Sequence, residues 1–351
     1  MMKRLSIIIP MYNVEPYVER CLRSLEDQDI SRDDYEIICI NDGSPDNSRD
    51  IVSRMQIEFD NIILIDQENQ GVSCARNHGM DRASGNYLLF IDPDDYVDPN
   101  CLARILKTAD EKQAQVSFLG FIFLNKDGNI RNVVLKDEYK DKIYPGLEAY
   151  FIARGDGNTD PDRMVAVLFK SEFLKRNNLR YLPDVFYLED GEFIVRILCL
   201  AENCIFDGYS FYQRTTRPGS ATNSKLFNTE KATSGFLLAA SNLKRFQQEQ
   251  NLTKKQRVFL NQPIVKFVLL AINSSIGRRS FRKFSDTVRT IKALTFNRID
   301  LENCNLEYWI CGKAYNFSPW LGALALIIYA RINRMKILMR LGKIFPLSDY
   351  L

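Results

Sequence analysis

Four short apolar runs, separated by helical patterns, occupy most of the first hundred residues of this chain. The runs are residues 5–10, 36–40, 61–65 and 87–91. They are rich in β-branched or aromatic residues and do not alternate regularly with polar ones, which is typical of strands buried on both faces. Helical patterns near 14–27, 48–59 and 71–83 connect them. This alternation predicts a doubly wound, mostly parallel α/β sheet flanked by helices.

Polar residues follow each apolar run, in segments 10–13, 41–44, 66–69 and 92–95. The carboxyl ends of parallel strands meet at one edge of a sheet, where ligands of open α/β sheets bind. We therefore expect a binding crevice at that edge. The chain has no Gly-x-Gly-x-x-Gly after the first run and no Gly-x-x-x-x-Gly-Lys. These absences argue against a dinucleotide-binding turn and a P-loop.

Composition narrows the class of protein. A chain of 351 residues, 46% apolar and 26% charged, can bury a large core and is not disordered. Eight cysteines form no Cys-x-x-Cys, and His78 is the single histidine, so we expect reduced thiols and a carboxylate-held metal. No apolar run reaches 18 residues, and residues 5–10 are too short for a signal-peptide core. A cytoplasmic location is expected.

Charge is distributed unevenly along the chain. From residue 240 onward there are 19 Lys and Arg against 6 Asp and Glu, a net charge of +13, whereas residues 1–239 carry −10. The acidic part suits a cation site. The basic part suits an anionic membrane face or a lipid diphosphate, or is simply a solvated surface. Nucleic acid is not expected, because no aromatic stacking motif is interleaved with the basic residues.

Four segments at the ends of the apolar runs resemble family 2 glycosyltransferases, which have the GT-A fold. They are residues 6–13, 40–46, 69–79 and 90–96. The resemblance implies a nucleotide-sugar-binding and catalytic domain over residues 1–225. It also implies inverting transfer of one sugar per encounter, since the Gln-x-x-Arg-Trp signature of processive synthases is absent. Residues 226–351 are expected to form a small helical appendage.

The motif Asp92-Pro93-Asp94 has the Asp-x-Asp form. Two carboxylates at a strand end can share one divalent cation, which can then bridge two phosphates, although three aspartates and a proline also make a good exposed turn. By resemblance, Asp92 faces the ribose and sugar and Asp94 ligates Mn²⁺ or Mg²⁺, with Asp92 as a second ligand. Asp95 could replace either.

The resemblance also assigns a nucleotide pocket. It places Asp42 at the uracil N3–H, with Pro10, Tyr12 and Asn13 lining the pocket and Glu15 at its rim. The alternative for Asp42 is a turn or helix-cap residue.

Three arginines and a glycine are expected around the donor. Gly71 and Arg76 lie in the third family-like segment, and Arg76 would contact the diphosphate or sugar. Its alternative is an ion pair with a strand-end aspartate. Arg214 and Arg217 lie in a segment that resembles the loop closing these sites, and they would contact the diphosphate.

Residues 188–193, Leu-Glu-Asp-Gly-Glu-Phe, resemble the family's Glu-Asp element at the start of a helix. By analogy Asp190 is the general base that takes the proton of the acceptor hydroxyl, and Glu189 is the alternative base. From the residues alone, both could simply be helix N-terminal carboxylates favoured by the macrodipole.

The C-terminal region shows helical periodicity over 229–250, 254–276 and 281–296. The apolar run 319–330 is followed by Arg331, Arg334, Lys336, Arg340 and Lys343. Twelve residues are too few to span a bilayer, so we expect a peripheral contact with the inner membrane face. A helix docked on the core and a dimer contact are the alternatives, and the oligomeric state is open.

Together these observations predict a metal-dependent glycosyltransferase of bacterial surface polysaccharide synthesis. It would move a hexose or N-acetylhexosamine from a UDP-sugar to a hydroxyl of a glycan or lipid-linked acceptor. The alternatives are a nucleotidyltransferase and a non-catalytic sugar-nucleotide-binding protein. A nucleotidyltransferase would carry a Gly-rich signature with Arg and Lys where this chain has residues 10–14, Pro-Met-Tyr-Asn-Val.

Overall fold

The structure is a computed structural model that describes residues 3–124, 130–133, 137–154, 163–215, 226–249 and 251–344. The chain forms two compact units, Met1–Ser224 and Lys225–Leu351. Each unit is described by itself.

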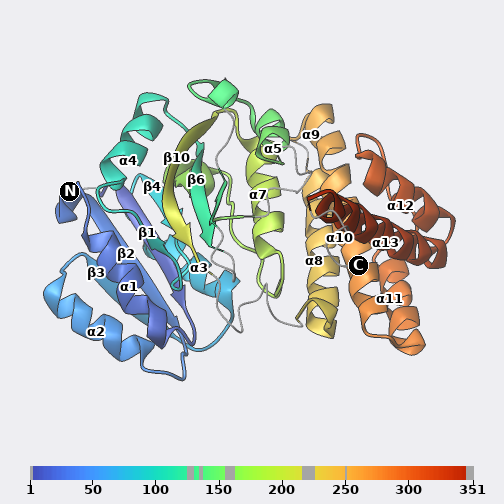
Figure 1. Ribbon diagram of the computed structural model, residues 1–351, viewed down its shortest axis with the longest axis horizontal. Helices are drawn as coiled ribbons and strands as arrows, with labels where there is room; N and C mark the ends of the chain where they lie inside the picture. Colours follow the sequence, from blue (N-terminus) through green and yellow to red (C-terminus); the bar gives the residue numbers. More distant parts are fainter. Residues whose placement is uncertain are drawn as a thin grey trace. The chain divides into compact units, whose positions relative to one another are not determined.

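The N-terminal unit is built on a mixed sheet, which has ten strands in the described part of the chain (Figure 1). The sheet order is β3-β2-β1-β4-β9-β6-β10-β5, with β7 beside β6 and β8 beside β10. The strands are β1 (Leu5–Met11), β2 (Tyr35–Asp42), β3 (Ile62–Gln67), β4 (Tyr87–Phe90), β5 (Tyr96–Val97), β6 (Val116–Leu124), β7 (Ile130–Val133), β8 (Ile143–Tyr144), β9 (Val167–Lys170) and β10 (Cys204–Arg214).

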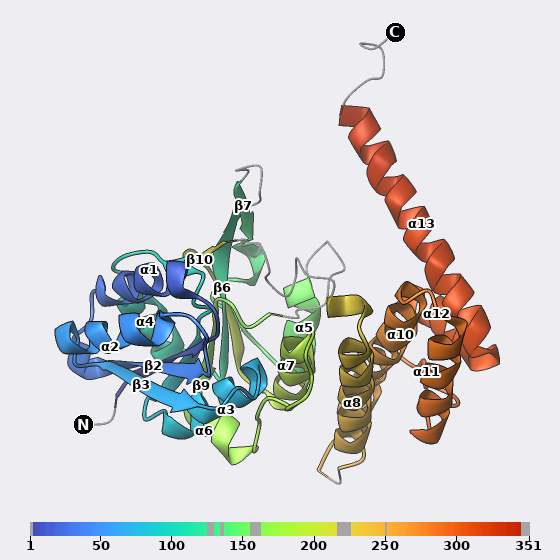
Figure 2. The ribbon, with the colours of Figure 1, turned by 90° about the horizontal axis from the view of Figure 1, so that it is seen from below.

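Helices cover both faces of this sheet. Figure 2 shows α1, α2 and α4 on one face and α3 and α6 on the other. The helices of this unit are α1 (Glu15–Glu26), α2 (Ser48–Glu58), α3 (Val72–Arg82), α4 (Leu102–Glu111), α5 (Gly146–Arg154), α6 (Ser171–Arg176) and α7 (Glu189–Leu200). The four expected strands and three expected helices are all present, with ends that differ by one or two residues.

The order of the strands reverses at β1. This strand pairs in parallel with β2 on one side and with β4 on the other, so Leu5 lies between Tyr35 and Tyr87. Beyond β4 the sheet becomes mixed, because β9 runs antiparallel to both β4 and β6. In open α/β sheets, ligands bind at the carboxyl ends of the strands where the strand order reverses. The ends of β1, β2 and β4 are therefore the expected place for a ligand.

Burial on both faces explains why β1 carries no polar alternation. All seven of its residues are buried, and Ile7 and Ile9 belong to the core that α1, α2 and α4 cover. Ile8 points to the other face, where α3 approaches closely. A Cβ on Gly79 of α3 would lie 2.4 Å from the Ile8 side chain. Each buried Ile contributes roughly 1.5–3 kcal/mol, so the strand anchors both layers.

The C-terminal unit is helical in its described residues. Its helices are α8 (Glu230–Gln247), α9 (Lys254–Phe259), α10 (Asn261–Gly277), α11 (Phe281–Ala293), α12 (Leu306–Phe317) and α13 (Pro319–Ile344). The helix expected over 254–276 is divided at Leu260 into α9 and α10. Among the described residues, one stretch, Lys254–Gly277, has the length and apolarity of a membrane span. However, 83% of its apolar window is buried inside the protein, as in a core helix.

Candidate active site

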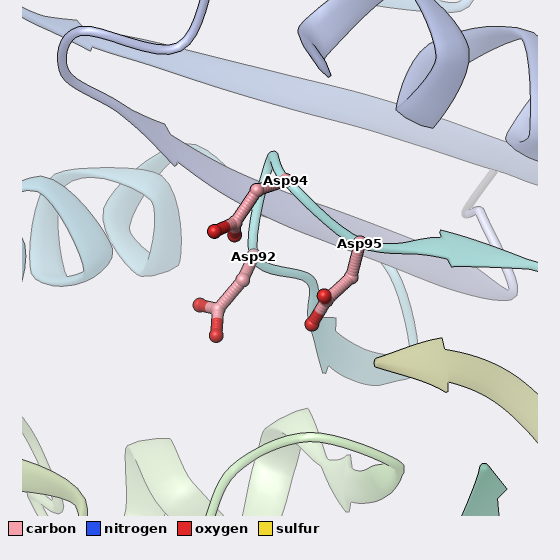
Figure 3. Close-up of side chains that lie close together, drawn as sticks. All are labelled: Asp92, Asp94 and Asp95. Carbon is pink, nitrogen blue, oxygen red and sulfur yellow. The ribbon is translucent and has the colours of Figure 1, made fainter. Parts of the chain in front are cut away.

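Three aspartates project from the turn that follows β4 (Figure 3). Carboxylate oxygens of Asp92, Asp94 and Asp95 lie within 4.8 Å of one another. The Asp92 side chain is 39% exposed and Asp94 is partly exposed, whereas Asp95 is buried. Asp92 and Asp94 are therefore accessible to solvent just after β4, as two ligands of a divalent cation would be.

Asp95 is engaged with β10. Its Oδ2 accepts a hydrogen bond from the Tyr212 hydroxyl (2.7 Å), and its Oδ1 accepts one from the Thr215 amide (2.7 Å). Burial, followed by the charge of Asp92, raises the pKa of Asp95 to about 7. Both oxygens of Asp95 accept hydrogen bonds from the protein. This arrangement fits a structural role better than the role expected from the sequence, in which Asp95 could replace Asp92 or Asp94 as a metal ligand.

Side chains distant in sequence hold the backbone of this turn. The Asp94 carbonyl accepts hydrogen bonds from Arg20 Nη2 (2.7 Å) and from the Thr215 hydroxyl (2.6 Å). The Asp92 amide donates to the Tyr212 hydroxyl oxygen (3.2 Å). These contacts fix the directions of Asp92 and Asp94. Sequence reasoning did not single out Arg20, Tyr212 or Thr215 as turn-binding residues, because no local pattern marks contacts made across such separations.

Arg76 of α3 connects this turn to the start of α7. The side chain is 5% exposed, and its guanidinium lies 3.3 Å from Asp92, 3.0 Å from Glu189 and 2.8 Å from Asp190. One buried cation thus brings together the carboxylate at the β4 end and the two carboxylates expected to include the base. The ion pair with Asp92 is the alternative that the sequence left open for Arg76.

The surroundings keep Arg76 charged. Burial by itself would lower its pKa, but the neighbouring acidic groups raise that pKa above its ordinary value. Those groups are Tyr181, Asp190, Glu189 and Asp92. The guanidinium also lies 5.0 Å from the centre of the Tyr181 ring, a cation–π distance. Tyr181 was not predicted as a site residue, and its neighbouring sequence gives no signal for this role.

Helix α7 begins with Glu189 and Asp190 in its first turn. Leu188, just before it, has a positive φ of 60°, a strained conformation for a branched side chain. Deeper in the helix, the fully buried Glu192 is ion-paired with Arg196 at 2.7 Å. The helix thus begins directly after Leu188, and its first two residues, Glu189 and Asp190, contact Arg76.

Asp42 lies at the end of β2 and is almost completely buried. Its Oδ1 accepts hydrogen bonds from Gln67 Nε2 and the Gln70 amide (both 2.8 Å), and its Oδ2 accepts one from the Gly71 amide (2.9 Å). Gly71 has a φ of +87°, which L side chains rarely adopt. Asp42 therefore shapes the loop before α3. A hydrogen bond from a nucleotide base to Asp42 would come in addition to these three hydrogen bonds.

The other residues predicted for the nucleotide pocket lie around the end of β1. Pro10 is buried within the strand and Tyr12 is 49% exposed just after it. The Asn13 amide donates to the Ser44 hydroxyl oxygen (2.7 Å). Glu15 accepts from the amide and side chain of Asn47 (3.1 and 3.0 Å), so it ties α1 to the start of α2.

Asp46 joins the same two loops. Its Oδ2 accepts from the Glu15 amide (2.7 Å), and its Oδ1 accepts from the hydroxyls of Ser44 and Ser48. Burial by itself would raise the pKa of Asp46, but these hydrogen bonds lower it to about 2. Asp46 also accepts a 3.1 Å hydrogen bond from the amide of Ser48, the first residue of α2, while Asn47 occupies the N-cap position.

Two arginines lie near the end of β10. Arg214 is the last residue of that strand, next to Thr215, which binds the aspartate turn. Burial, followed by the charge of Arg214, lowers the pKa of Arg163 to about 10, so the two cations are neighbours. Arg163 was not predicted. Arg217 lies outside the described residues. Pro93 is buried in the aspartate turn, and the His78 ring pairs with Gln67 (2.9 Å) beside Asp42.

Comparisons with known proteins show which proteins this chain resembles. Residues 6–164 match the family model described as glycosyl transferase family 2. The chain is 32% identical over 230 residues, or 63% of its length, to an uncharacterized glycosyltransferase, EpsJ, of Bacillus subtilis. It is 33% identical over 131 residues, or 37% of its length, to GalNAc(5)-diNAcBac-PP-undecaprenol beta-1,3-glucosyltransferase of Campylobacter jejuni. These matches span 64% and 41% of the relatives' own lengths.

Two solved structures share the fold. TarS 1–349 of S. aureus, in complex with UDP-GlcNAc, aligns with a TM-score of 0.56 at 19% identity, over 84% of this chain and 91% of that one. The mannosyltransferase PcManGT of Pyrobaculum calidifontis, in complex with GDP-Man and Mn²⁺, aligns at 0.52 and 15% identity, over 93% and 87%. The mostly parallel curled sheet, its flanking helices and the C-terminal helices are thus those of GT-A glycosyltransferases. Residues 6–164 of this chain thus match glycosyl transferase family 2, and the fold is the one found in these two solved glycosyltransferases.

Proposed function

We propose that this protein transfers one sugar from a UDP-sugar to a hydroxyl acceptor in the synthesis of a bacterial cell-surface glycan. Capsule, O-antigen and exopolysaccharide are the candidate products. The sugar would be a hexose or an N-acetylhexosamine. The observation that carries the proposal is that Arg76 forms ion pairs with Asp92 and with both Glu189 and Asp190, and so holds these carboxylates close together.

The ion pairs of Arg76 support separate roles for the residues after β4 and the residues at the start of α7. Asp92 and Asp94 lie in the turn after β4, where the family resemblance places the donor. Asp190 starts α7 on the other side of Arg76, where an acceptor hydroxyl could approach. In a single displacement the acceptor oxygen forms a bond to C1 as the bond from C1 to the diphosphate oxygen breaks. The leaving UDP takes the bonding electron pair, and the configuration at C1 is inverted.

Asp190 would accept the proton of the acceptor hydroxyl on its carboxylate. Because Arg76 lies 2.8 Å from that carboxylate, the ion pair fixes its direction before substrate arrives. Glu189, 3.0 Å from the same guanidinium, is the alternative base. Arg214, and with it Arg217, would contact the diphosphate oxygens as negative charge develops there.

The chemistry of Asp92 and Asp94 fits a divalent cation. Their oxygens are close together and reach the crevice, and hard oxygen ligands suit Mg²⁺ and Mn²⁺. When bound, such an ion would neutralise charge on the leaving diphosphate. A solved structural neighbour holds Mn²⁺ with its sugar nucleotide, which supports Mn²⁺ as the first ion to test.

For the nucleotide, we propose uracil, bound beside Asp42 with Pro10, Tyr12, Asn13 and Gly71 around it. UDP-GlcNAc in the TarS complex supports this choice, and GDP-Man in PcManGT makes guanine the competing base. A lipid-linked acceptor is supported by the undecaprenol-linked acceptor named in the Campylobacter relative. Such an acceptor would place the enzyme at the cytoplasmic membrane face as a peripheral protein.

A thermal-shift titration with UDP, GDP, CDP and ADP, each with and without Mn²⁺, tests the donor site. We expect stabilisation by UDP that requires Mn²⁺ and is lost in Asp94→Asn. Asp50→Asn, a change at an exposed acid outside the crevice, is the matched control. A preference for GDP or CDP would overturn the uracil assignment.

Turnover is tested separately. Release of UDP from a panel of UDP-sugars, with an extracted lipid-linked acceptor fraction, should depend on Asp190. UDP binding without turnover by any panel member would favour the non-catalytic sugar-nucleotide-binding protein.

A further inference from the structure

The first three turns of α13 carry an exposed apolar stripe. Its members follow helical spacing and have exposed fractions between 37% and 51%. They are Trp320, Leu321, Leu324, Ile327 and Ile328. The opposite side of the helix is buried, since a Cβ on Gly322 would lie 2.9 Å from Tyr315 of α12. One side of α13 therefore packs against α12, and the stripe forms a second, apolar side that is exposed to solvent.

An aromatic contact extends the stripe onto α11. Phe281, at the start of α11, is 75% exposed and stacks on Trp320 with ring centres 5.0 Å apart. The buried ring of Phe284 contacts the same indole, with ring centres 4.4 Å apart. We call Phe281 together with the five stripe residues the α11–α13 patch. Large contiguous apolar surfaces of this kind usually mark an interaction site.

Cations flank the patch. Arg279, Arg282 and Lys283 are exposed on either side of Phe281, and Arg331 is exposed at the end of the stripe. The nearby acid Asp286 is paired with Arg289 at 2.7 Å. Residues 225–351 as a whole carry 21 Lys and Arg against 7 Asp and Glu. Aromatic and aliphatic side chains bordered by cations complement the interfacial region of an anionic bilayer.

The dimensions of the segment favour lying on the bilayer over crossing it. The apolar part of α13, Pro319–Arg331, has 13 residues and is about 20 Å long at 1.5 Å per residue. The hydrocarbon core of a bilayer is about 30 Å thick. Figure 2 shows α13 continuing past α11 and α12, so its length beyond the patch lies clear of these two helices.

We propose that the α11–α13 patch docks this protein onto an anionic phospholipid surface. Phe281, Trp320 and the aliphatic stripe enter the interface between headgroups and acyl chains. Arg279, Arg282, Lys283 and Arg331 pair with lipid phosphates. The inference rests on the C-terminal unit alone, so it stands or falls independently of the transferase activity.

The two tryptophans of the chain, Trp309 and Trp320, make a direct test possible. In a Trp309→Phe variant of the full chain, Trp320 is the single indole reporter. We expect its emission to shift to shorter wavelength with vesicles of phosphatidylcholine and phosphatidylglycerol, and not with phosphatidylcholine alone. Raising NaCl from about 0.1 M to about 0.5 M should reverse the shift, because added salt screens the charges.

Co-sedimentation with the same vesicles locates the surface. Leu324→Glu/Ile328→Glu should weaken binding at least about tenfold, since two carboxylates replace aliphatic side chains that would enter the bilayer interface. Arg282→Glu/Lys283→Glu should weaken it by a similar factor. The matched controls are Ile310→Glu, on an exposed part of α12, and Lys254→Glu/Lys255→Glu, at exposed cations of α9. Both should bind like the unmodified protein.

Three results would overturn the proposal. The first is that the unmodified protein does not bind phosphatidylglycerol vesicles. The second is that the control variants lose binding as fully as the patch variants. The third is a lipid-free oligomer, seen by sedimentation velocity, that Leu324→Glu/Ile328→Glu dissociates, because the patch would then be covered by a second copy of the chain.

Discussion

The two sides of the crevice use carboxylates in opposite ways. On the β2 side, Asp42 and Asp46 direct their oxygens at backbone amides, hydroxyls and one side-chain amide, and so shape the loops. On the β4 and α7 side, Asp92 and Asp190 meet one arginine and keep part of their surface exposed. The oxygens of Asp42 and Asp46 are hydrogen-bonded within the protein, whereas the partly exposed oxygens of Asp92 and Asp190 can still bind a ligand. Substitutions should therefore affect stability on one side and turnover on the other.

The largest effect is expected at Asp190. Asp190→Asn keeps the shape but removes the proton acceptor, so kcat should fall about a thousandfold. The thermal unfolding midpoint should change little, because the amide oxygen can still accept from Arg76. Glu189→Gln is the matched control and should cost less than about tenfold. If the control loses more than Asp190→Asn, the base is Glu189 and the assignment is wrong.

Arg76 lies on the same side as Asp92 and Asp190, yet its side chain is buried. Arg76→Gln leaves Asp92, Glu189 and Asp190 without their shared cation, and we expect a loss of about 3 kcal/mol in the free energy of unfolding. Turnover should fall about a hundredfold, mostly in kcat. Arg76→Lys should recover most of the stability but only part of kcat, since an ammonium cannot make the same forked contacts.

A double-mutant cycle between Arg76→Gln and Asp190→Asn separates positioning from simple loss of folding. Coupled residues show strong non-additivity, so the double variant should be little slower than Asp190→Asn alone. Additive effects on kcat would show that Arg76 acts apart from Asp190.

On the β2 side, Asp42→Asn should mainly reduce stability. The new amide nitrogen would face one of the donors now bound by Asp42, namely Gln67, Gln70 or Gly71. We expect a loss of about 1–3 kcal/mol in urea unfolding, the cost of an unsatisfied buried donor. Binding of UDP should weaken with kcat nearly unchanged. A full loss of kcat in a folded variant would contradict the proposed division between the two sides.

The smallest effect is expected at Asp46, and it depends on pH. The native pKa of about 2 lies below the unfolded value of 3.8, so Asp46 stabilises the native state fully above pH 3.8. That contribution is lost as pH falls through about 2. Asp46→Ala should cost about 1 kcal/mol at neutral pH, since the group is partly screened by solvent. Urea midpoints of both proteins should converge as the solution is made more acidic.

The sequence was informative where local pattern decides structure. The runs that form β1, β2, β3 and β4 could be recognised because strands buried on both faces need continuous apolar residues. The mixed half of the sheet could not be placed, because the antiparallel pairing of β9 with β4 and β6 joins segments about 50–80 residues apart.

The same limit applies within the site. The strand-end aspartates and the Glu-Asp pair of α7 were found from their motifs. The sequence did not show that both contact Arg76, because it left two roles open for this arginine, a contact with the donor and an ion pair with an aspartate. Tyr181, Tyr212 and Thr215 carry no motif of their own for their roles. They are defined by contacts with Arg76, Asp92 and Asp95, which lie more than 100 residues away in the chain.

The link between the loops after β1 and β2 has a consequence for how the protein moves. The amides of Asn13, Val14 and Glu15 donate to Ser44, Ser48 and Asp46, and the Asn47 amide donates back to Glu15. Neither loop can open without breaking the bonds of the other. These four amide protons should therefore exchange with deuterium at a common, slow rate, as one cooperative unit. Selection among nucleotides would then be made by a surface formed before the ligand arrives.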